Sequence, residues 1–98
     1  MKKGYWVVTY RSISDGEKLK EYGKVAGPAI QAAGGKTLVR TSDGIEPHES
    51  GLAQRVVLIE FESFAKASAA YSSDAYKQAV KVLGDAAVRD IRIVEGVD

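Results

Sequence analysis

Two charged residues on predicted strands, Arg40 and Glu60, are the first candidates for chemistry in this chain. Arg40 alternates in step with Leu38, so it can point from an apolar face into a cavity, where a guanidinium binds a carboxylate or an enolate through paired hydrogen bonds. Glu60 follows Val56 and Leu58 on one strand face and could serve as a general base or as the partner of Arg40. Both could instead be structural, as a strand-end arginine in solvent and an ordinary ion pair.

His48 is the only histidine, and it lies between two glutamates in "IEPHES" (45–50). Histidine is the usual acid–base residue near neutral pH, so His48 is a third catalytic candidate beside Arg40 and Glu60. The alternative is a solvated loop histidine. The group formed by Glu46, His48 and Glu49 has no second histidine or cysteine to complete a ligand shell, so we expect no metal site.

Two tyrosines flank the stretch "SSD" (72–74), Tyr71 at the end of one predicted helix and Tyr76 near the start of the next. Residues five apart on a continuous helix point about 140° away from each other, so the break would let both rings converge. We expect them at the mouth of a cavity, with Tyr71 the more buried. Tyr71, Tyr76 and Trp6 are therefore the candidate ligand-binding residues, and the alternative is that all three pack in the core or, for Trp6, at a dimer contact.

The composition describes an ordinary globular chain, and we expect one domain over residues 1–98. Of the 98 residues, 45% are hydrophobic and 28% are charged, and the net charge of +1 gives no attraction to nucleic acid or to an anionic membrane. Without cysteine, disulfides and thiolate chemistry are excluded. The apolar run near the N-terminus is interrupted at Thr9, too early for a signal peptide or a membrane span, so a cytoplasmic protein is expected. No motif indicates a cofactor.

The elements that must position these residues follow from the hydrophobic pattern. Strands are predicted over 4–11, 36–41, 55–62 and 89–96, where β-branched and aromatic residues gather. A helix begins at the capping-box spacing of Ser14 and Glu17, with a kink or restart expected near Gly27 and Pro28, and it ends at Gly34–Gly35.

The second helical region divides into "FAKASAAY" (64–71), capped by Ser63, and "AYKQAVKVL" (75–83), capped by Ser73 or Asp74 and ended by Gly84. The order βαββαβ predicts an α+β ferredoxin-like plait, an antiparallel sheet with helices on one face. Because the strand 55–62 is apolar on both faces, the uncovered face must be buried, and a second copy of the chain is the simplest partner. The sequence therefore predicts a homodimeric α+β barrel.

Several stretches together resemble a small bacterial family of domains of unknown function (DUF1330-like) in the dimeric α+β barrel superfamily. They are "GYW", "EYGK", "AGPAIQAAGGKTLVR", "VVLIEFES", "AAYSSDAYKQ" and "IVEG". The resemblance covers about residues 4 to 97 and implies the fold and the homodimer. Arg40, Glu60, Tyr71 and Tyr76 match positions of the family's motifs. The wider superfamily is similar in shape to cofactor-free monooxygenases, small isomerases, haem-degrading enzymes and stress proteins, which is analogy of fold alone.

Two functional hypotheses follow. The first is a small-molecule pocket between sheet and helices, in a cofactor-free enzyme similar to a monooxygenase or an isomerase. The second is a non-catalytic dimer that binds a metabolite or a protein. A shared cavity for Arg40, the tyrosines and either Glu60 or His48 would favour chemistry, and their separation would favour binding. RNA binding on the sheet is disfavoured because the RNP signature is absent and the charge is near zero.

Overall fold

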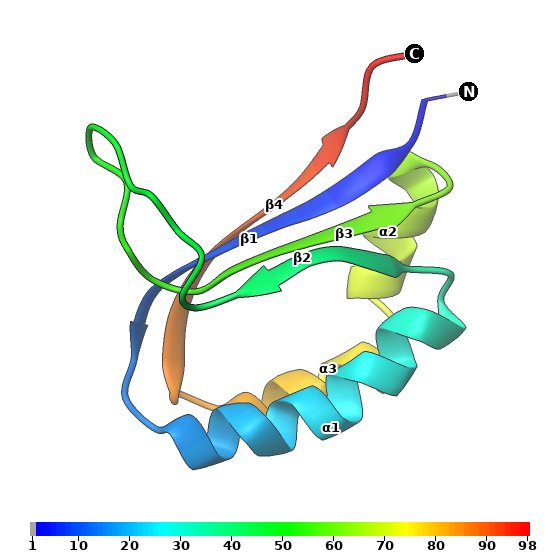
Figure 1. Ribbon diagram of the computed structural model, residues 1–98. Coiled ribbons are helices and arrows are strands. Elements are labelled where there is room, and N and C mark those ends of the chain that lie inside the picture. Colours follow the sequence, from blue (N-terminus) through cyan, green and yellow to red (C-terminus); the bar gives the residue numbers. More distant parts are fainter. Residues whose placement is uncertain (1) are drawn as a thin grey trace.

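The computed structural model describes residues 2–98, which form a four-stranded sheet and three helices (Figure 1). In chain order the elements are β1 (Gly4–Ile13), α1 (Gly16–Ala32), β2 (Lys36–Thr41), β3 (Val56–Phe61), α2 (Phe64–Tyr71), α3 (Asp74–Leu83) and β4 (Ala87–Glu95). The predicted order is confirmed. Two strands extend farther than predicted, because the pairing of β1 with β4 resumes after an irregularity and adds Ser12↔Val88 and Ile13↔Ala87.

The sheet is antiparallel with the strand order β2-β3-β1-β4, and the helices lie on one of its faces (Figure 1). This is the predicted ferredoxin-like α+β arrangement. Alternate residues of β1 and β3 face the helices and are buried: Trp6, Val8, Tyr10, Ile59 and Phe61. Antiparallel partners share a face, so the register sets rows across the sheet, such as Ile59–Trp6–Ile93 and Val57–Val8–Ile91.

The start of α1 differs from the predicted capping box. Asp15 is the N-cap, and its carboxylate accepts hydrogen bonds from the backbone N–H groups of Glu17 and Lys18, both at 3.1 Å. Ser14 is used elsewhere, because its backbone N–H and its hydroxyl both donate to the carbonyl of Ala86. These bonds connect the end of β1 to the segment before β4. Because the Ser14 hydroxyl is used in this long-range contact, it does not cap α1 as the local sequence pattern predicts.

A kink or a restart was expected near Gly27 and Pro28, and the restart does not occur. The helix runs without a break from Gly16 to Ala32, with Pro28 inside it. Proline lacks one backbone N–H donor, but the other backbone hydrogen bonds of the helix keep it continuous on both sides of Pro28. The predicted end is confirmed, since Gly34 follows with a φ of 91°, a conformation that glycine adopts without steric cost.

The predicted break between the two later helices is confirmed. Ser63 caps α2, and its hydroxyl accepts from the N–H of Lys66. Ser73 caps α3, with its hydroxyl accepting from the N–H of Tyr76 and donating to the carbonyl of Ala70. One serine side chain therefore closes one helix and opens the next.

Small residues let the two short helices approach the sheet closely. Ala67, Ala70 and Ala79 are buried in this layer beside Trp6, whose indole N–H donates to the carbonyl of Ala67 at 2.8 Å. Phe61 packs on the same indole, with 5.3 Å between ring centroids. Trp6 and Phe61 therefore form the α2 end of a core that continues through Val8 and Tyr10 to Leu83 and Ala86.

The other face of the sheet is not covered by any element of residues 2–98 (Figure 1). It carries half-buried Tyr5, Val7, Val56 and Leu58 and exposed Val94. The prediction that the sheet is apolar on both faces is thus confirmed for this region. We call this uncovered surface the open face.

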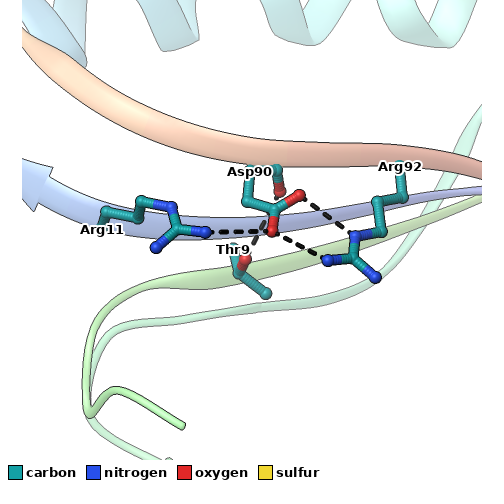
Figure 2. Close-up of polar contacts among 4 residues, drawn as sticks. All are labelled: Thr9, Arg11, Asp90 and Arg92. Carbon is teal, nitrogen blue, oxygen red and sulfur yellow. Dashed lines mark hydrogen bonds and ion pairs between the residues drawn. The ribbon is translucent and has the colours of Figure 1, made fainter. Parts of the chain in front are cut away.

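Charged residues stand among the apolar ones on the open face. Figure 2 shows Asp90 between Arg92, which donates to both carboxylate oxygens at 3.2 and 3.3 Å, and Arg11, at 3.6 Å. The Thr9 hydroxyl donates to the Asp90 carbonyl. The hydrogen bonds from Arg92 lower the pKa of Asp90, as do the charges of both arginines, so the carboxylate is ionised at neutral pH.

None of the helices in residues 2–98 is long and apolar enough to cross a membrane.

Candidate functional site

A cavity of about 970 Å³ lies between the sheet and α1. Its sheet wall is largely apolar and includes Trp6, Val8, Val57 and Ile59. The opposite wall is one side of α1, where Leu19 and Ile30 alternate with glycines at 16, 23 and 27. A Cβ atom at any of these three glycines would meet nothing within 4 Å. The helix thus presents little side-chain volume to the sheet, and the space between them stays open.

The charged residues that line this cavity are all cationic. They are Lys20, Lys24, Lys36, Arg40, Arg55 and Arg89. No aspartate, glutamate or histidine belongs to the described lining. In residues 2–98 the ion pairs within 4.0 Å include none of the three arginines. Lys24 pairs with Glu21, which lies outside the lining, at 3.2 Å, so the positive charge that no acidic residue of the described chain pairs with lies on the other five residues.

Two of these arginines lie in one row across the sheet, on either side of Tyr10. Arg89 is the β4 partner of Tyr10, and the Tyr10 N–H donates to the carbonyl of Arg55 at 3.0 Å. Neighbouring strands are about 5 Å apart, so the two arginine backbones are about 10 Å apart. The Arg89 guanidinium lies 5.8 Å from the centre of the Tyr10 ring. This end of the cavity is cationic. The next row is apolar at Val57, Val8 and Ile91 but ends at Arg40 on β2, and the row of Trp6 beyond it is apolar at Ile59 and Ile93.

Arg55 has an unused donor at this site. Its Nη1 donates to the Ser42 hydroxyl at 3.2 Å, but its Nε is buried without a hydrogen-bond partner in the described chain. A buried donor without an acceptor is costly, on the order of 1–3 kcal/mol. Arg55 lines the cavity, but this nitrogen is itself covered by protein atoms.

Arg89 contacts two phenols. Its Nη1 donates to the hydroxyl oxygens of Tyr22 (3.0 Å) and Tyr76 (3.3 Å), and these two oxygens are 2.6 Å apart. The Arg89 guanidinium also lies 5.0 Å from the centre of the Tyr22 ring. Tyr22 comes from α1, Tyr76 from α3 and Arg89 from β4. The cluster therefore joins both helices to the sheet.

The protonation states of this cluster follow from its surroundings. Burial, and then the neighbouring Tyr76, raise the pKa of Tyr22 far above its ordinary value of 10.0, although Arg89 opposes this change. Burial by itself lowers the pKa of Arg89, but the two phenols outweigh burial and the net change is upward. At neutral pH, Tyr22 is a neutral phenol and Arg89 is a cation.

The predicted meeting of Arg40 and Glu60 is wrong. Arg40 pairs with Val57, whose row faces the helices, and it lines the cavity. Glu60 lies three residues beyond Val57, so it points to the open face, where the Tyr5 hydroxyl donates to it at 3.4 Å and Lys3 is 3.7 Å away. The β2–β3 register shifts between Thr37 and Val39, so Leu38 no longer alternates in step with Arg40.

His48 also lies away from the cavity. Its Nε2 is 2.6 Å from the carboxylate of Glu46, and both side chains are largely exposed in the connection between β2 and β3. The separation of both Glu60 and His48 from the cavity lining meets the condition that favours binding over chemistry.

The rings of Tyr71 and Tyr76 lie close together as predicted, but the more buried of the two is Tyr76 and not Tyr71. The rings of Tyr71 and Tyr76 are 5.4 Å apart, yet Tyr71 is 39% exposed and Tyr76 is 1% exposed. Tyr76 lies between Trp6 and Tyr22, whereas Tyr71 touches the outer edge of Trp6. The prediction that Tyr71 is the more buried is therefore wrong. Neither tyrosine belongs to the cavity lining, although Trp6 does.

Three residues of the cavity were missed by sequence reasoning. Tyr22 lies within the predicted first helix and was not among the candidate site residues. Arg55 and Arg89 lie at the starts of predicted strands, where a charged residue suggests solvent. The sequence did contain a pattern that could have identified them. Arg55 is two residues from Val57 and Arg89 is two residues from Ile91, so both arginines lie on the face that the helices cover.

Comparison with known proteins identifies a family and a fold. Residues 3–97 match the family described as "Domain of unknown function (DUF1330)". No curated protein matches the chain. A protein of unknown function from Rhodopseudomonas palustris is similar in structure, with a TM-score of 0.69 and 21% identity over 95% of this chain and 79% of that one.

Two further solved structures show the same fold. A proposed antibiotic biosynthesis monooxygenase from Nitrosomonas europaea has a TM-score of 0.64 and 14% identity, with 98% of this chain and 90% of that chain covered. A nipsnap family protein of unknown function from Agrobacterium tumefaciens has a TM-score of 0.59 and 13% identity, with 97% and 88% covered. At these identities the likeness concerns the fold alone.

Proposed function

The chain belongs to the DUF1330 family, whose description names no function, and we propose that it is a homodimer whose protomers each bind a small organic anion in the cavity under the sheet. One observation carries the proposal. Three arginines and three lysines line the cavity, and the described lining holds no acidic residue. A half-buried guanidinium is stable when an anion pairs with it, so a ligand anion would supply the missing partner.

The form of the cavity indicates what else the ligand must offer. A volume of about 970 Å³ is within the range of sites for small organic molecules. Val8, Val57, Trp6 and Ile59 form an apolar wall beside the cationic row of Arg55 and Arg89, and Arg40 lies at the β2 edge of this wall. A ligand with an anionic group at one end and an apolar body, such as an aromatic acid, matches both parts.

Binding is favoured over base catalysis by where the acid–base candidates lie. Glu60 is on the open face and His48 is in an exposed connection, so neither can reach a molecule held between the sheet and α1. A cofactor-free enzyme is the second candidate. Tyr22 and Arg89 favour it, because a phenol and a guanidinium together stabilise an enolate or a phenolate formed from a substrate. The similarity in fold to a proposed monooxygenase is compatible with this second candidate.

The homodimer is supported by the open face. This surface carries apolar residues such as Val7 and Leu58 together with charges of both signs, including Glu60, Asp90 and Arg92. In a twofold dimer the same surface meets itself, and a surface with both signs of charge can be complementary to its own copy. A second copy is therefore the occupant that this face fits.

Binding of 8-anilinonaphthalene-1-sulfonate, a fluorescent aryl anion, tests the site. We expect saturable binding with one site per protomer that weakens as salt is added. Arg55→Gln should lower the affinity about tenfold, because it removes a charged donor from the cavity. Lys66→Gln is the matched control, since Lys66 lies on α2 outside the lining and pairs with Glu62. Equal affinity in both variants would contradict this site for the anion.

A further inference from the structure

The cluster of Tyr22, Tyr76 and Arg89 contains one more phenolic proton than its own hydrogen bonds can use. A phenol donates one hydrogen bond and accepts up to two. Arg89 already donates to both phenol oxygens, so it uses one acceptor position on each. The 2.6 Å contact between the oxygens of Tyr22 and Tyr76 uses only one of the two phenolic protons. The other proton has no acceptor among the hydrogen bonds of residues 2–98.

The position of the two rings indicates which proton is left over. Tyr76 is buried between Trp6 and Tyr22 and is not part of the cavity lining, so its hydroxyl meets only the cluster. Tyr22 and Arg89 both line the cavity. If Tyr76 donates to Tyr22, the phenolic proton left without an acceptor is that of Tyr22, which can then donate into the cavity. The opposite direction would bury an unused proton on Tyr76, which costs more.

The group that accepts this proton must be compatible with Arg89. The guanidinium has no carboxylate partner within ion-pair distance in residues 2–98. An oxyanion accepts from both a phenol and a guanidinium, and such charge-assisted hydrogen bonds are about twice as strong as neutral ones. The same row of the sheet holds Arg55, whose buried Nε also has no acceptor.

We propose that the cavity recognises the carboxylate of an aromatic acid, with the Tyr22 hydroxyl and Arg89 as its donors and Tyr76 as the residue that positions Tyr22. This inference rests on the proposed function and adds the class and the orientation of the ligand. The carboxylate lies at the row of Tyr10 and Arg89, and the aromatic body extends along Val8 toward Trp6. Tyr76 contacts Tyr22 and not the ligand, so it is a positioning residue.

Competition between two isosteric probes tests this proposal. Bound 8-anilinonaphthalene-1-sulfonate is displaced with naphthalene-2-carboxylate and, separately, with naphthalene-2-carboxamide, which has the same shape but no charge. In the unmodified protein the carboxylate should compete at roughly tenfold lower concentration than the amide. Tyr22→Phe should weaken the carboxylate by about tenfold and change the amide far less.

Tyr76→Phe reports the direction of the hydrogen bond between the phenols. If Tyr76 donates to Tyr22, its removal weakens the carboxylate by a few-fold, because Tyr22 keeps its proton but loses the group that orients it. If Tyr22 donates to Tyr76, the variant frees the proton of Tyr22 and carboxylate binding becomes tighter. Tyr71→Phe is the control, since Tyr71 touches the Tyr76 ring but lies outside the cavity lining.

Each outcome separates this inference from the proposed function. No saturable binding of the fluorescent anion would overturn the proposed function itself. Anion binding with equal competition by the acid and the amide would leave that function in place and overturn the carboxylate assignment. Tighter carboxylate binding in Tyr76→Phe would overturn the assigned positioning role. Circular dichroism melts identify a variant that does not fold, and the acid–amide comparison in the unmodified protein decides the ligand class without any variant.

Discussion

Arg89 is a half-buried cation whose nearest polar partners in the described chain are two phenols. Neutral oxygens satisfy the hydrogen bonds of a guanidinium but leave its charge unbalanced. A ligand anion would supply that balance, so binding should stabilise the folded state through mass action. At a ligand concentration a hundred times Kd the gain is about 2.7 kcal/mol.

The stability of the protein should fall above pH 10 because of Tyr22. The pKa of Tyr22 is raised in the folded state above its ordinary value of 10.0, so the unfolded chain loses this proton first as the pH rises. The folded state then binds more protons than the unfolded state, and the free energy of unfolding decreases with pH. The slope from this one proton is about 1.4 kcal/mol per pH unit. Below pH 10 the contribution of Tyr22 is fully present.

Urea unfolding between pH 8 and pH 11 measures this slope, and Tyr22→Phe isolates it. The variant lacks the titrating hydroxyl, so its stability should decrease less steeply by about one proton. A Tyr22→Phe slope equal to that of the unmodified protein would show that Tyr22 does not hold its proton in the folded state.

The candidate site could be predicted only in part at this scale. The position of Arg40 on the helix-covered face was expected from its alternation with Leu38, and Arg40 does line the cavity. However, Leu38 lies where the register shifts, so the orientation of Arg40 follows from its pairing with Val57 and not from that alternation. Glu60 was assigned to the same cavity because a register shift leaves no sign in the local sequence.

Among the elements, the boundaries set by local chemistry were predictable and those set by distant contacts were not. Ser63, Ser73 and Gly84 act within one turn of their own helices, and their positions agree with the prediction. The first helix is capped by Asp15, because Ser14 bonds to Ala86 across 72 residues of sequence. A single sequence shows the spacing of a capping box but not this competing partner.

The cavity itself depends on the glycines of α1. Gly16, Gly23 and Gly27 lie on the side of the helix that lines the cavity, and glycine in a helix interior costs about 0.5–1 kcal/mol relative to alanine. Side chains at these positions would add volume to the α1 wall of the cavity, where a Cβ atom now has open space around it. The helix is thus less stable than it could be, and the space under the sheet remains open.

Substitution of Gly23 should separate the stability of α1 from the volume of the cavity. Gly23→Ala should stabilise the protein by about 0.5–1 kcal/mol, because a Cβ there meets nothing within 4 Å. Gly23→Leu should also be stable but should fill the cavity and reduce binding of 8-anilinonaphthalene-1-sulfonate at least tenfold. Thermal unfolding and fluorescence titration measure the two effects. If Gly23→Leu bound the anion as Gly23→Ala does, the ligand would lie outside the space between α1 and the sheet.

For the whole molecule, the sequence correctly indicated that the sheet has a second apolar face. The order of the elements placed every helix on one side, and the alternation in β3 put Val56 and Leu58 on the other. What covers that face depends on another molecule, which a single chain does not contain. The charged residues around Asp90 make this surface more polar than the face that the helices cover (Figure 2).

The homodimer should be broken by one charge at the centre of the open face. Leu58 pairs with Val7 there and is half-buried in the single chain, so Leu58→Lys adds a charge that the isolated protomer can leave in water. In a dimer the same lysines would be buried between two apolar faces, which costs several kcal/mol. Light scattering at micromolar concentration should give a dimer for the unmodified chain and a monomer for Leu58→Lys. Val80→Lys, on the exposed side of α3, should remain a dimer. A monomeric unmodified chain, or a Leu58→Lys variant that stays dimeric, would show that the open face does not hold the second copy.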